Sequence, residues 1–536
     1  MKKEKYYKTL RKNGLFCGEC HCHINYPQNP KAVRKYLKEN GIDYLSLCQG
    51  WLTNPRQSIG HDGKKLAKFL RSFSDRTVHI RMGAEFPKTR FGHVCWWRFP
   101  HISDPFGVYM NYHDTDYFKI AGISNDKIKN PSDEIPYSNE SPLLKVARWK
   151  KLGGITMSPH PTSWWLENKN SDLICTNISV DFCLDLLTHR FYDTLVVMGY
   201  DAEQIFYQNF WFQLLNMGYK INAVAETDGD LTSHHKIGSL RTYAYCNSPY
   251  FSEDKFLTAI KNGNTFLTSG PVIFANTSGG KIPGDIIICD GQKEEINFTV
   301  YSSPEKEEYI SWVVIYKNGR PIKIFDIETK RSREFSGKLS LNTPDKKNLD
   351  WYIIKAYGST RPEKKEFLDI LRYCKLCEKE IHTEYRNIKQ LAITNPFYFY
   401  AKDYKEPEPI KSAFSLRLTD KNSRPIENAE IKIIEPDSEK KLFSNKNGLV
   451  SLKKISPLAE ILISHPNYTT KFFSIYLDYT PLKKYMENIY SGKWAFKNKN
   501  LQPGQVPFSV FDIKNLIGIL SEINIKISLE EKEDKQ

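Results

Sequence analysis

GECHCHINY, residues 18–26, places His21 and His23 two positions apart near the start of the chain. If residues 15–23 form a strand, alternate side chains share a face, so the two imidazoles point to one spot, with Glu19 on the same side. Neutral imidazole is a common ligand for zinc, iron, nickel and manganese. The stretch therefore predicts part of a metal site, although a histidine pair packed within an ordinary strand gives the same pattern.

The chain around this strand alternates short apolar runs with amphipathic segments as far as residue 270. Pro30 suits the first turn of a helix and Gly41 lies just past its end. Strand–helix repeats of this size predict a parallel sheet, open or closed into a barrel. The expected strands cover residues 15–23, 43–48, 78–86, 155–158, 194–198, 220–225 and 265–268, and the expected helices cover residues 30–40, 64–73, 143–152, 180–189, 202–217 and 256–261.

Further candidate ligands follow the ends of these expected strands. Glu85 ends HIRMGAEF, His93 follows in FGHVCWW, His160 ends ITMSPHP, and Asp228 ends INAVAETD. Parallel-sheet folds place their active sites at the carboxyl ends of strands. A lone histidine there is usually an ordinary surface group, but a repeated occurrence within one alternating domain predicts a metal centre. Its candidate ligands are His21, His23, Glu85, His93, His160 and Asp228.

These motifs resemble the polymerase and histidinol phosphatase (PHP) metallohydrolases, in particular the carbaryl-hydrolase-like CehA/McbA branch. The matching stretches are GECHCH, GAEFP followed by GH, the histidine of SPHP, ETDGD, and GSLRTYAYC followed by AIKNGNTFLTSGPVIF. The resemblance covers residues 14–320. It implies an α/β fold, a distorted (β/α)7 barrel of the PHP type that holds two or three divalent metal ions.

The resemblance also implies a role for each candidate ligand. One ion would be held by His21, His23, Glu85 and Asp228. A second would be held by His93 and His160, with Glu85 bridging the two. The implied cofactors are two divalent ions of zinc, manganese or iron, because mixed imidazole and carboxylate sites accept all three. No Ser or Cys lies in a recognisable nucleophile motif, so the expected nucleophile is a metal-bound water.

The chain departs from the family where a third ion would bind. LCQG, residues 47–50, stands in place of the family's Asp-His pair, and Asp230 replaces a histidine. A third site is therefore expected to be absent or rebuilt. His234 and His235 lie close enough in sequence to substitute, or they form an exposed loop pair.

Three other residues are expected to contact a substrate. Gln49 and Trp51 are candidates to line its pocket, while Arg241 either binds an anionic substrate group or forms a structural salt bridge. The net charge of +15 fits an anionic substrate, although solvated lysines spread over the surface explain it equally well. No nucleic-acid-binding motif is present, so the expected partner is a small-molecule or glycan-linked substrate.

The pattern changes after residue 270, where apolar and polar residues alternate as in antiparallel strands. An Asn-Gly pair at 318–319 carries the signal of a β-hairpin. A lone C-x-x-C, Cys374 and Cys377, is a weak zinc signal. The expected domains are a metal-binding barrel over 1–270, a β-sandwich over 271–402 with a helical insert near 366–382, a transthyretin- or carboxypeptidase-regulatory-like β-sandwich over 410–478, and a helical or extended tail over 479–536.

The composition is that of a folded protein with several domains. Its 536 residues are too many for one core, and 40% of them are hydrophobic. Eleven scattered cysteines favour reduced thiols over a disulfide scaffold. No apolar run suits a cleaved signal peptide or a membrane span, so a cytoplasmic protein is expected.

Two functions of different classes follow from these observations. The first is a metal-dependent hydrolase of a phosphoester, or of a carboxylic ester or carbamate. The alternative is a non-catalytic glycan- or protein-binding protein with a degenerate barrel. The first two ligand sets are complete in the sequence, which favours the enzyme.

Overall fold

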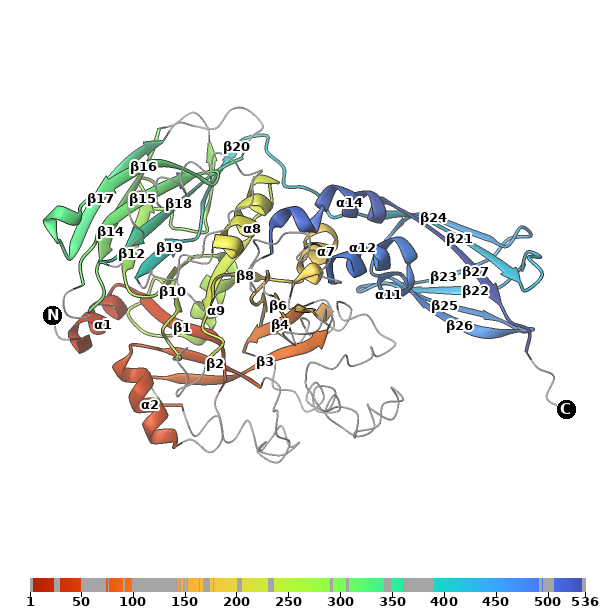
Figure 1. Cartoon of the computed structure of the whole chain (residues 1–536), viewed down its shortest axis with the longest axis horizontal. Helices are drawn as coiled ribbons and strands as arrows, with labels where there is room; N and C mark the ends of the chain where they lie inside the picture. Colours follow the sequence, from red (N-terminus) through yellow and green to blue (C-terminus); the bar gives the residue numbers. More distant parts are fainter. Residues whose placement is uncertain are drawn as a thin grey trace.

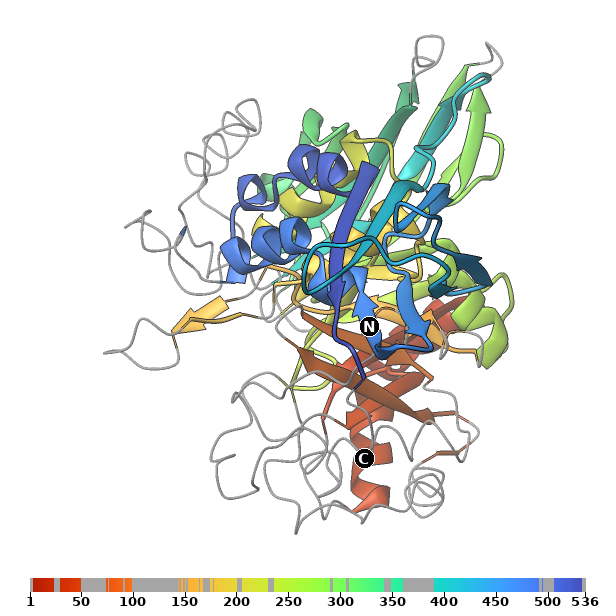
Figure 2. The ribbon, with the colours of Figure 1, turned by 90° about the vertical axis from the view of Figure 1, so that its right-hand side faces the viewer.

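A computed structural model gives the fold of the chain (Figure 1). β-Strands dominate it and form several sheets. The C-terminal strands form an extended lobe at the end opposite the N-terminus, and Figure 2 looks onto that lobe. The structure describes residues 3–23, 29–49, 74–75, 77–89, 92–98, 143, 146–147, 150, 153–162, 164–166, 174–176, 178–199, 205–229, 236–289, 293–304, 308–341, 349–359, 390–490, 494 and 506–532.

The first region is built around β1 (Leu15–Cys22), whose residues are all buried. β1 pairs in parallel with β2 (Tyr44–Gln49), which pairs in parallel with β3 (His79–Thr89). On its other edge β1 pairs antiparallel with β10 (Arg241–Tyr245), which pairs antiparallel with β11 (Thr265–Thr268). Beyond β3 the sheet continues through β4 (Gly92–Trp97), β5 (Ile155–Ser158), β8 (Thr194–Gly199) and β9 (Asn222–Glu226).

The predicted (β/α)7 barrel of an α/β protein is wrong. The pairs β1–β10, β10–β11, β3–β4 and β4–β5 are antiparallel. Among the described residues the hydrogen-bonded path is open, with β9 at one end and strands of the following region at the other. β4 begins three positions after β3 ends, which is too short for the crossover that a parallel pair needs. The strand–helix alternation missed both β4 and β10, and the result is a mixed, β-rich sheet.

Helices flank this sheet and begin where the sequence provides a cap. α2 (Pro30–Glu39) follows Asn29, whose side chain accepts a hydrogen bond from the backbone of Lys31. α9 (Glu253–Asn262) ends at Gly263, which adopts a left-handed φ of 79°. The other helices of the region are α1 (Lys3–Lys12), α7 (Val180–Thr188) and α8 (Ile205–Asn216).

Antiparallel strands follow residue 270, as the alternation predicted. β12 (Val272–Thr277), β14 (Glu294–Tyr301) and β17 (Glu334–Leu341) form a three-stranded sheet. β15 (Trp312–Lys317) and β16 (Arg320–Asp326) form the predicted Asn-Gly hairpin. This hairpin joins the large sheet, because β15 pairs antiparallel with β18 (Leu349–Tyr357). The same sheet contains β13 (Ile286–Cys289), β19 (Leu391–Thr394) and β20 (Phe397–Ala401).

Asn395 and β19 tie this second region to the first. β19 pairs antiparallel with β11. The Asn395 side chain accepts from the Ala223 backbone N–H at 2.7 Å and donates to the Ala223 carbonyl at 2.9 Å. Thr242 Oγ1 accepts from the Ala225 N–H at 2.9 Å. Side chains thus satisfy the outer edge of β9, which an exposed strand would leave unpaired.

The third unit contains two further sheets. β21 (Ser412–Asp420) pairs antiparallel with β24 (Leu449–Ile455) and in parallel with β27 (Glu522–Leu529), which lies within the segment expected to be a tail. β27 alternates exposed and buried residues over its whole length. The second sheet contains β23 (Glu439–Phe443), β22 (Glu430–Ile434), β25 (Glu460–His465) and β26 (Tyr468–Ser474), and the helices of this unit are α11 (Ile475–Asp478), α12 (Thr480–Tyr490) and α14 (Ile513–Ser521).

α7 lies between the first region and the third unit (Figure 1). All of its residues are buried. The Tyr476 hydroxyl donates to Asp181 of α7, and His189, which follows α7, lies with its Nε2 3.0 Å from Ser456 Oγ. The third unit is therefore packed onto the first region through specific polar contacts.

Several predicted features lie outside the described residues. They are the helix over 64–73, most of the helix over 143–152, and the insert near 366–382 with Cys374 and Cys377. No helix in the described part of the chain is long and apolar enough to cross a lipid bilayer.

Candidate metal centre

The candidate centre lies where the ends of β1 and β9 meet. The chain that leaves β9 runs alongside the end of β1, because Asp228 N donates to His21 O at 2.9 Å and His23 N donates to Gly229 O at 2.9 Å. Cys22 and Gly229 form a parallel bridge between the two segments. Backbone pairing therefore brings together side chains that lie more than 200 positions apart in the sequence.

Four of the six predicted ligands gather at this point. His21 Nε2 and His23 Nε2 each lie 3.2 Å from Asp228 Oδ1. The rings of His21 and His160 have their centroids 5.5 Å apart. His21, His160 and Asp228 each offer a ligand atom within 4.8 Å of the others. His21 and His160 are fully buried, so the cluster reaches inward from the surface.

Glu226 supports two of these ligands and was missed by the sequence analysis. Its Oε2 lies 2.6 Å from His21 Nδ1, and its Oε1 accepts from the His160 backbone N–H at 2.8 Å. A carboxylate bound to one ring nitrogen of a histidine orients the other nitrogen, which is how metal-binding histidines are usually held. The signal was available, because Glu226 stands two positions before Asp228 and alternate residues of a strand share a face.

Backbone strain coincides with two of the candidate ligands. His160 has a φ of 25° and Asp228 a φ of 45°. Non-glycine residues adopt such left-handed conformations at a cost of about 1–3 kcal/mol and concentrate at functional sites. The fold therefore holds both side chains in place against a local energetic cost.

Glu19 braces the segment that carries Asp228 instead of joining the ligand cluster. Its carboxylate accepts from Thr227 N at 3.0 Å and from Gly238 N at 2.5 Å. Burial raises the pKa of Glu19 to about 8, although these two amides and Arg241 act in the opposite direction. Glu19 therefore stabilises the backbone at Thr227 and Gly238 through hydrogen bonds, and it does not belong to the ligand groups found among the described residues.

Two thiols also approach His21, and the sequence analysis did not consider them as ligands. Cys48 and Cys95 are buried, and their sulfur atoms lie with a His21 nitrogen in a group whose members are within 4.8 Å of one another. Cys22, by contrast, donates to Ser46 O at 3.6 Å. The pairing of β1 with β2 is irregular between Glu19 and Cys22, so strict alternation does not hold there.

The other two predicted ligands and the predicted pocket residues are only partly described. Glu85 lies on β3 opposite Cys95 of β4, and His93 lies on β4. Gln49 ends β2. The side chains of these three residues, and all of Trp51, Asp230, His234 and His235, lie outside the described part of the chain.

Arg241 makes structural contacts. It donates through Nε to Gly238 O at 2.9 Å and through Nη1 to Asn40 O at 2.8 Å. These bonds fasten the end of α2 to the turn before β10. Both acceptors are backbone carbonyls, and Arg241 forms no salt bridge with the residues that the structure describes. Its alternative role, the binding of an anionic substrate group, stays a prediction.

The described donors fit a divalent ion. Two ligands of one ion lie roughly 3 Å apart when each is about 2.1 Å from it, and both imidazole–carboxylate separations are 3.2 Å. Imidazole with carboxylate suits zinc, manganese or iron, and the neighbouring thiols would favour zinc. The arrangement has ligands, an orienting carboxylate in Glu226 and a buried inner side, which are the features of a coordination site.

Comparison with known proteins adds no identification. No family model matches the chain, and no curated protein matches it. Among solved structures, BcpA, the major pilin subunit of Bacillus cereus, is 10% identical over 38% of this chain and 61% of its own, with a TM-score of 0.12. The Bacillus anthracis TIE protein is 8% identical over 48% of this chain and 41% of its own, with a TM-score of 0.15. The chain thus spans less than two-thirds of either protein, and similarity at this level establishes no shared fold.

Proposed function

We propose that this chain is a metal-dependent hydrolase that acts on a phosphoester, or on a carboxylic ester or carbamate. The observation that carries the proposal is the cluster of His21, His160 and Asp228, whose ligand atoms lie within 4.8 Å of one another. The resemblance of the surrounding motifs to PHP metallohydrolases supports the same reaction class. Glu85 and His93 are proposed to complete two adjacent ion sites.

The residues of this chain would bind, orient and shield the reacting groups. A divalent ion, when bound, supplies a Lewis acid and lowers the pKa of a coordinated water. Glu226 fixes the orientation of His21 through Nδ1, which directs Nε2 toward Asp228. The buried position of His21 and His160 keeps bulk water from the inner side of the site, which strengthens electrostatic interactions there.

The substrate class follows from charge and the neighbouring residues. A net charge of +15 favours an anionic phosphoester, whereas the resembled branch favours an ester or carbamate. Gln49, the last residue of β2, and Trp51 are proposed to contact the substrate. The partner is therefore a small molecule or a glycan-linked group.

Metal analysis combined with a substrate screen tests the proposal. The full chain would be reconstituted with zinc, manganese or iron, and the expected content is two ions per chain. Activity would be measured on p-nitrophenyl phosphate, bis-p-nitrophenyl phosphate, p-nitrophenyl acetate and 1-naphthyl N-methylcarbamate. Chelation should abolish hydrolysis and metal addition should restore it. Content clearly below one ion after reconstitution, or hydrolysis that survives complete metal removal, would overturn the proposal.

A further inference from the structure

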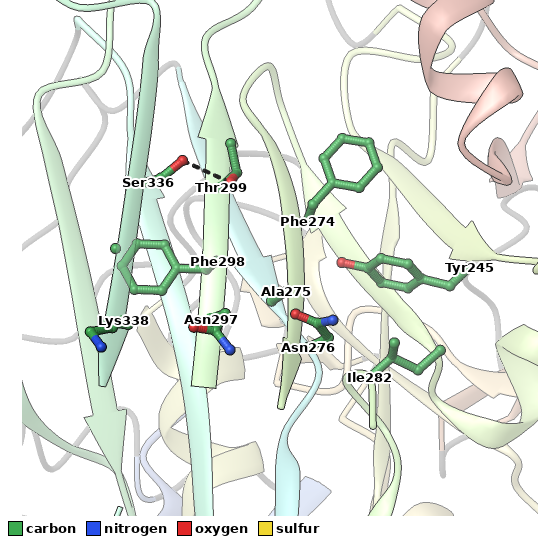
Figure 3. A pocket seen from close by; sticks show the side chains of 11 residues that line it. Tyr245, Phe274, Ala275, Asn276, Ile282, Asn297, Phe298, Thr299, Ser336 and Lys338 are labelled. Atoms are coloured by element: carbon green, nitrogen blue, oxygen red, sulfur yellow. Dashed lines mark hydrogen bonds between the residues drawn. The ribbon is translucent and has the colours of Figure 1, made fainter. Parts of the chain in front are cut away.

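A groove of about 590 Å³ lies on the outer face of the sheet formed by β12, β14 and β17 (Figure 3). Most of its lining comes from the second region, Tyr245 comes from β10 of the first, and none of the candidate metal ligands lines it. The inner face of the same sheet packs into a hydrophobic core through residues such as Ile273, Phe298 and Val300. The groove is therefore a surface supported by a rigid core.

The floor of the groove consists of two rows of side chains that cross the three strands. Phe274, Thr299 and Ser336 are in register in one row. Asn276, Asn297 and Lys338 are in register in the next. Directly opposed residues of an antiparallel pair lie about 4.5–5.5 Å apart, and rows two residues apart are about 7 Å apart. This grid spaces an aromatic ring, hydroxyls and amides over the width of one sugar ring.

The aromatic side chains are held in place. Tyr245, which comes from β10, donates its hydroxyl to Ile273 O at 2.7 Å. Phe274 packs edge-to-face against Tyr301, with ring centroids 5.9 Å apart. Figure 3 shows Tyr245 pointing toward Phe274 and Asn276 across one side of the groove. The rings are thus preorganised, so little side-chain entropy is lost when a ligand packs on them.

Two amides in the floor are available to a ligand. Within the described part of the chain, the side chains of Asn276 and Asn297 make no hydrogen bond, although they are directly opposed across β12 and β14. Each amide offers two donor hydrogens and a carbonyl acceptor. The hydroxyls of Thr299 and Ser336 are paired at 2.8 Å, and Lys338 is paired with Glu295 at 3.3 Å. The groups left to bond a ligand are therefore two uncharged amides, each of which can donate and accept a hydrogen bond at the same time.

We propose that this groove binds a neutral polysaccharide or the neutral sugar chain of a glycan. The C–H face of a sugar ring packs on Phe274 and Tyr245, while its adjacent hydroxyls or acetamido group bond to Asn276 and Asn297. Apolar walls with a few placed polar groups are the usual composition of a ligand site of this volume. The groove is open and not enclosed, which suits a chain that continues beyond it.

A peptide is a poorer match to the same surface. Peptides that bind to sheets usually add a strand at an edge, through backbone hydrogen bonds. The floor here is the side-chain face of β14, the middle strand, whose backbone groups are already paired with β12 and β17. The groove also carries no unpaired charge among its described residues that would select an acidic or basic peptide.

Binding of defined sugars to the full chain tests the proposal. The probes are chitohexaose, cellohexaose, xylohexaose, mannohexaose and maltohexaose, measured by saturation-transfer difference NMR and isothermal titration. At least one should bind, with its ring C–H protons showing the strongest saturation. Phe274→Ala and Asn276→Ala should each weaken binding about tenfold or more, a change equivalent to about 1.4 kcal/mol. Asn276 is exposed, so its replacement tests the groove even if Phe274→Ala reduces stability.

Phe443→Ala is the matched control, because this phenylalanine of β23 is 58% exposed and lies in the third unit. It should leave sugar binding unchanged. Chelator-treated protein should also bind sugar normally, which separates this site from the candidate metal centre. The proposal is overturned if none of the five sugars binds, if a peptide library competes for the groove in preference to them, or if binding survives both groove substitutions.

Discussion

β1 and β21 are both interior strands of their sheets, but they are built in opposite ways. β21 alternates buried and more exposed positions along its whole length, as a strand with one apolar face should. β1 is buried throughout, carries Glu19 and His21 in its interior, and has an irregular register with β2. Burying ionisable groups costs free energy unless they are well bonded. The difference indicates that β21 serves stability, whereas β1 retains groups that stability alone does not require.

The largest expected effect is the loss of metal binding in His21→Ala. His21 lies in the ligand group with His160 and Asp228, and also in the group with two thiols. Mutation of a residue that only hydrogen-bonds to a metal ligand typically lowers metal affinity about 10–100-fold. Removal of a direct ligand should therefore lower metal affinity more than about 100-fold. Elemental analysis and competition with a chromophoric chelator would measure this. His465→Ala in β25 is the matched control and should leave metal content unchanged; equal loss in both variants would contradict the proposal.

The second prediction concerns β21, where a substitution should reduce stability and leave metal binding unchanged. Leu416 is fully buried in this strand and pairs with Val450 and Ile525. Leu416→Ala should lower the free energy of unfolding of the third unit by about 2–5 kcal/mol, because a large buried side chain is replaced by a cavity. Denaturant unfolding followed by tryptophan fluorescence and calorimetry would measure the change.

Metal content should not change in Leu416→Ala, and the exposed neighbour Arg417 provides the control substitution, Arg417→Ala, with little effect on stability. If Leu416→Ala also released metal, the third unit would be coupled to the candidate centre. The division of roles, with β21 serving stability and β1 serving the metal centre, would then be wrong.

The same contrast explains what could be predicted from the sequence. Regular alternation after residue 270 and the Asn-Gly pair at 318–319 predicted antiparallel strands and the β15–β16 hairpin, whereas β27 of the third unit lies in the segment expected to be a tail. His21, His23, His160 and Asp228 were found because each follows an apolar run. The pairing partners were not predictable from these patterns, since β10 and β27 join strands far away in sequence. The closed parallel barrel was therefore inferred from local alternation that does not determine strand direction.

Glu226 and the thiols of Cys48 and Cys95 show a second limit of prediction from the sequence. Glu226 matters because it bonds to two residues from other elements, His21 and His160. Cys48 and Cys95 approach His21 only because β1, β2 and β4 lie in one sheet. No sequence period reveals such tertiary contacts. The positive φ of Asp228 is likewise imposed by the surrounding structure and is not encoded by a glycine.

Glu226→Gln should have a smaller effect than removal of a ligand. The amide keeps the shape of the side chain but removes the charge that holds His21 Nδ1 at 2.6 Å. We expect metal affinity to fall about 10–100-fold with the fold retained, as for other orienting carboxylates. Competition with a chelator would measure the affinity, and thermal unfolding would check the fold. Unchanged affinity would show that Glu226 does not orient a metal ligand.

A pH dependence of stability is expected at α7, the helix between the two contrasted regions. Asp185 accepts from Phe191 N and Tyr192 N, each at 2.8 Å, and burial raises the pKa of this carboxyl to about 7. The unfolded value is near 3.8, so the native state binds the proton more tightly between these pH values. Asp185 therefore favours folding more as the pH falls from about 7 to about 4, by at most about 1.4 kcal/mol per pH unit.

The comparison of wild type with Asp185→Asn isolates this contribution, because Lys150, Asp193 and Asp181 face the site in both proteins. The stability of wild type relative to the variant, from thermal or denaturant unfolding, should increase as the pH is lowered from 7 toward 4 and stay constant above 7. A difference independent of pH would show that Asp185 titrates near its ordinary value in the folded protein.

The smallest expected effect is that of Cys22→Ser, which tests whether the two sides of β1 differ in function. Cys22 packs in the hydrophobic core and donates to Ser46 O at 3.6 Å, so the substitution replaces one buried thiol by a hydroxyl of similar shape. We expect a loss of about 1 kcal/mol in stability, with metal content and hydrolysis largely retained. Cys48→Ser is the comparison variant, because Cys48 belongs to the group of possible ligands that includes His21. This substitution should change the affinity or the selectivity for the metal ion. If Cys22→Ser bound metal normally but had no activity, the reaction would require this thiol. The bound ions would then be structural, and the side of β1 that carries Cys22 and packs in the hydrophobic core would be the functional one.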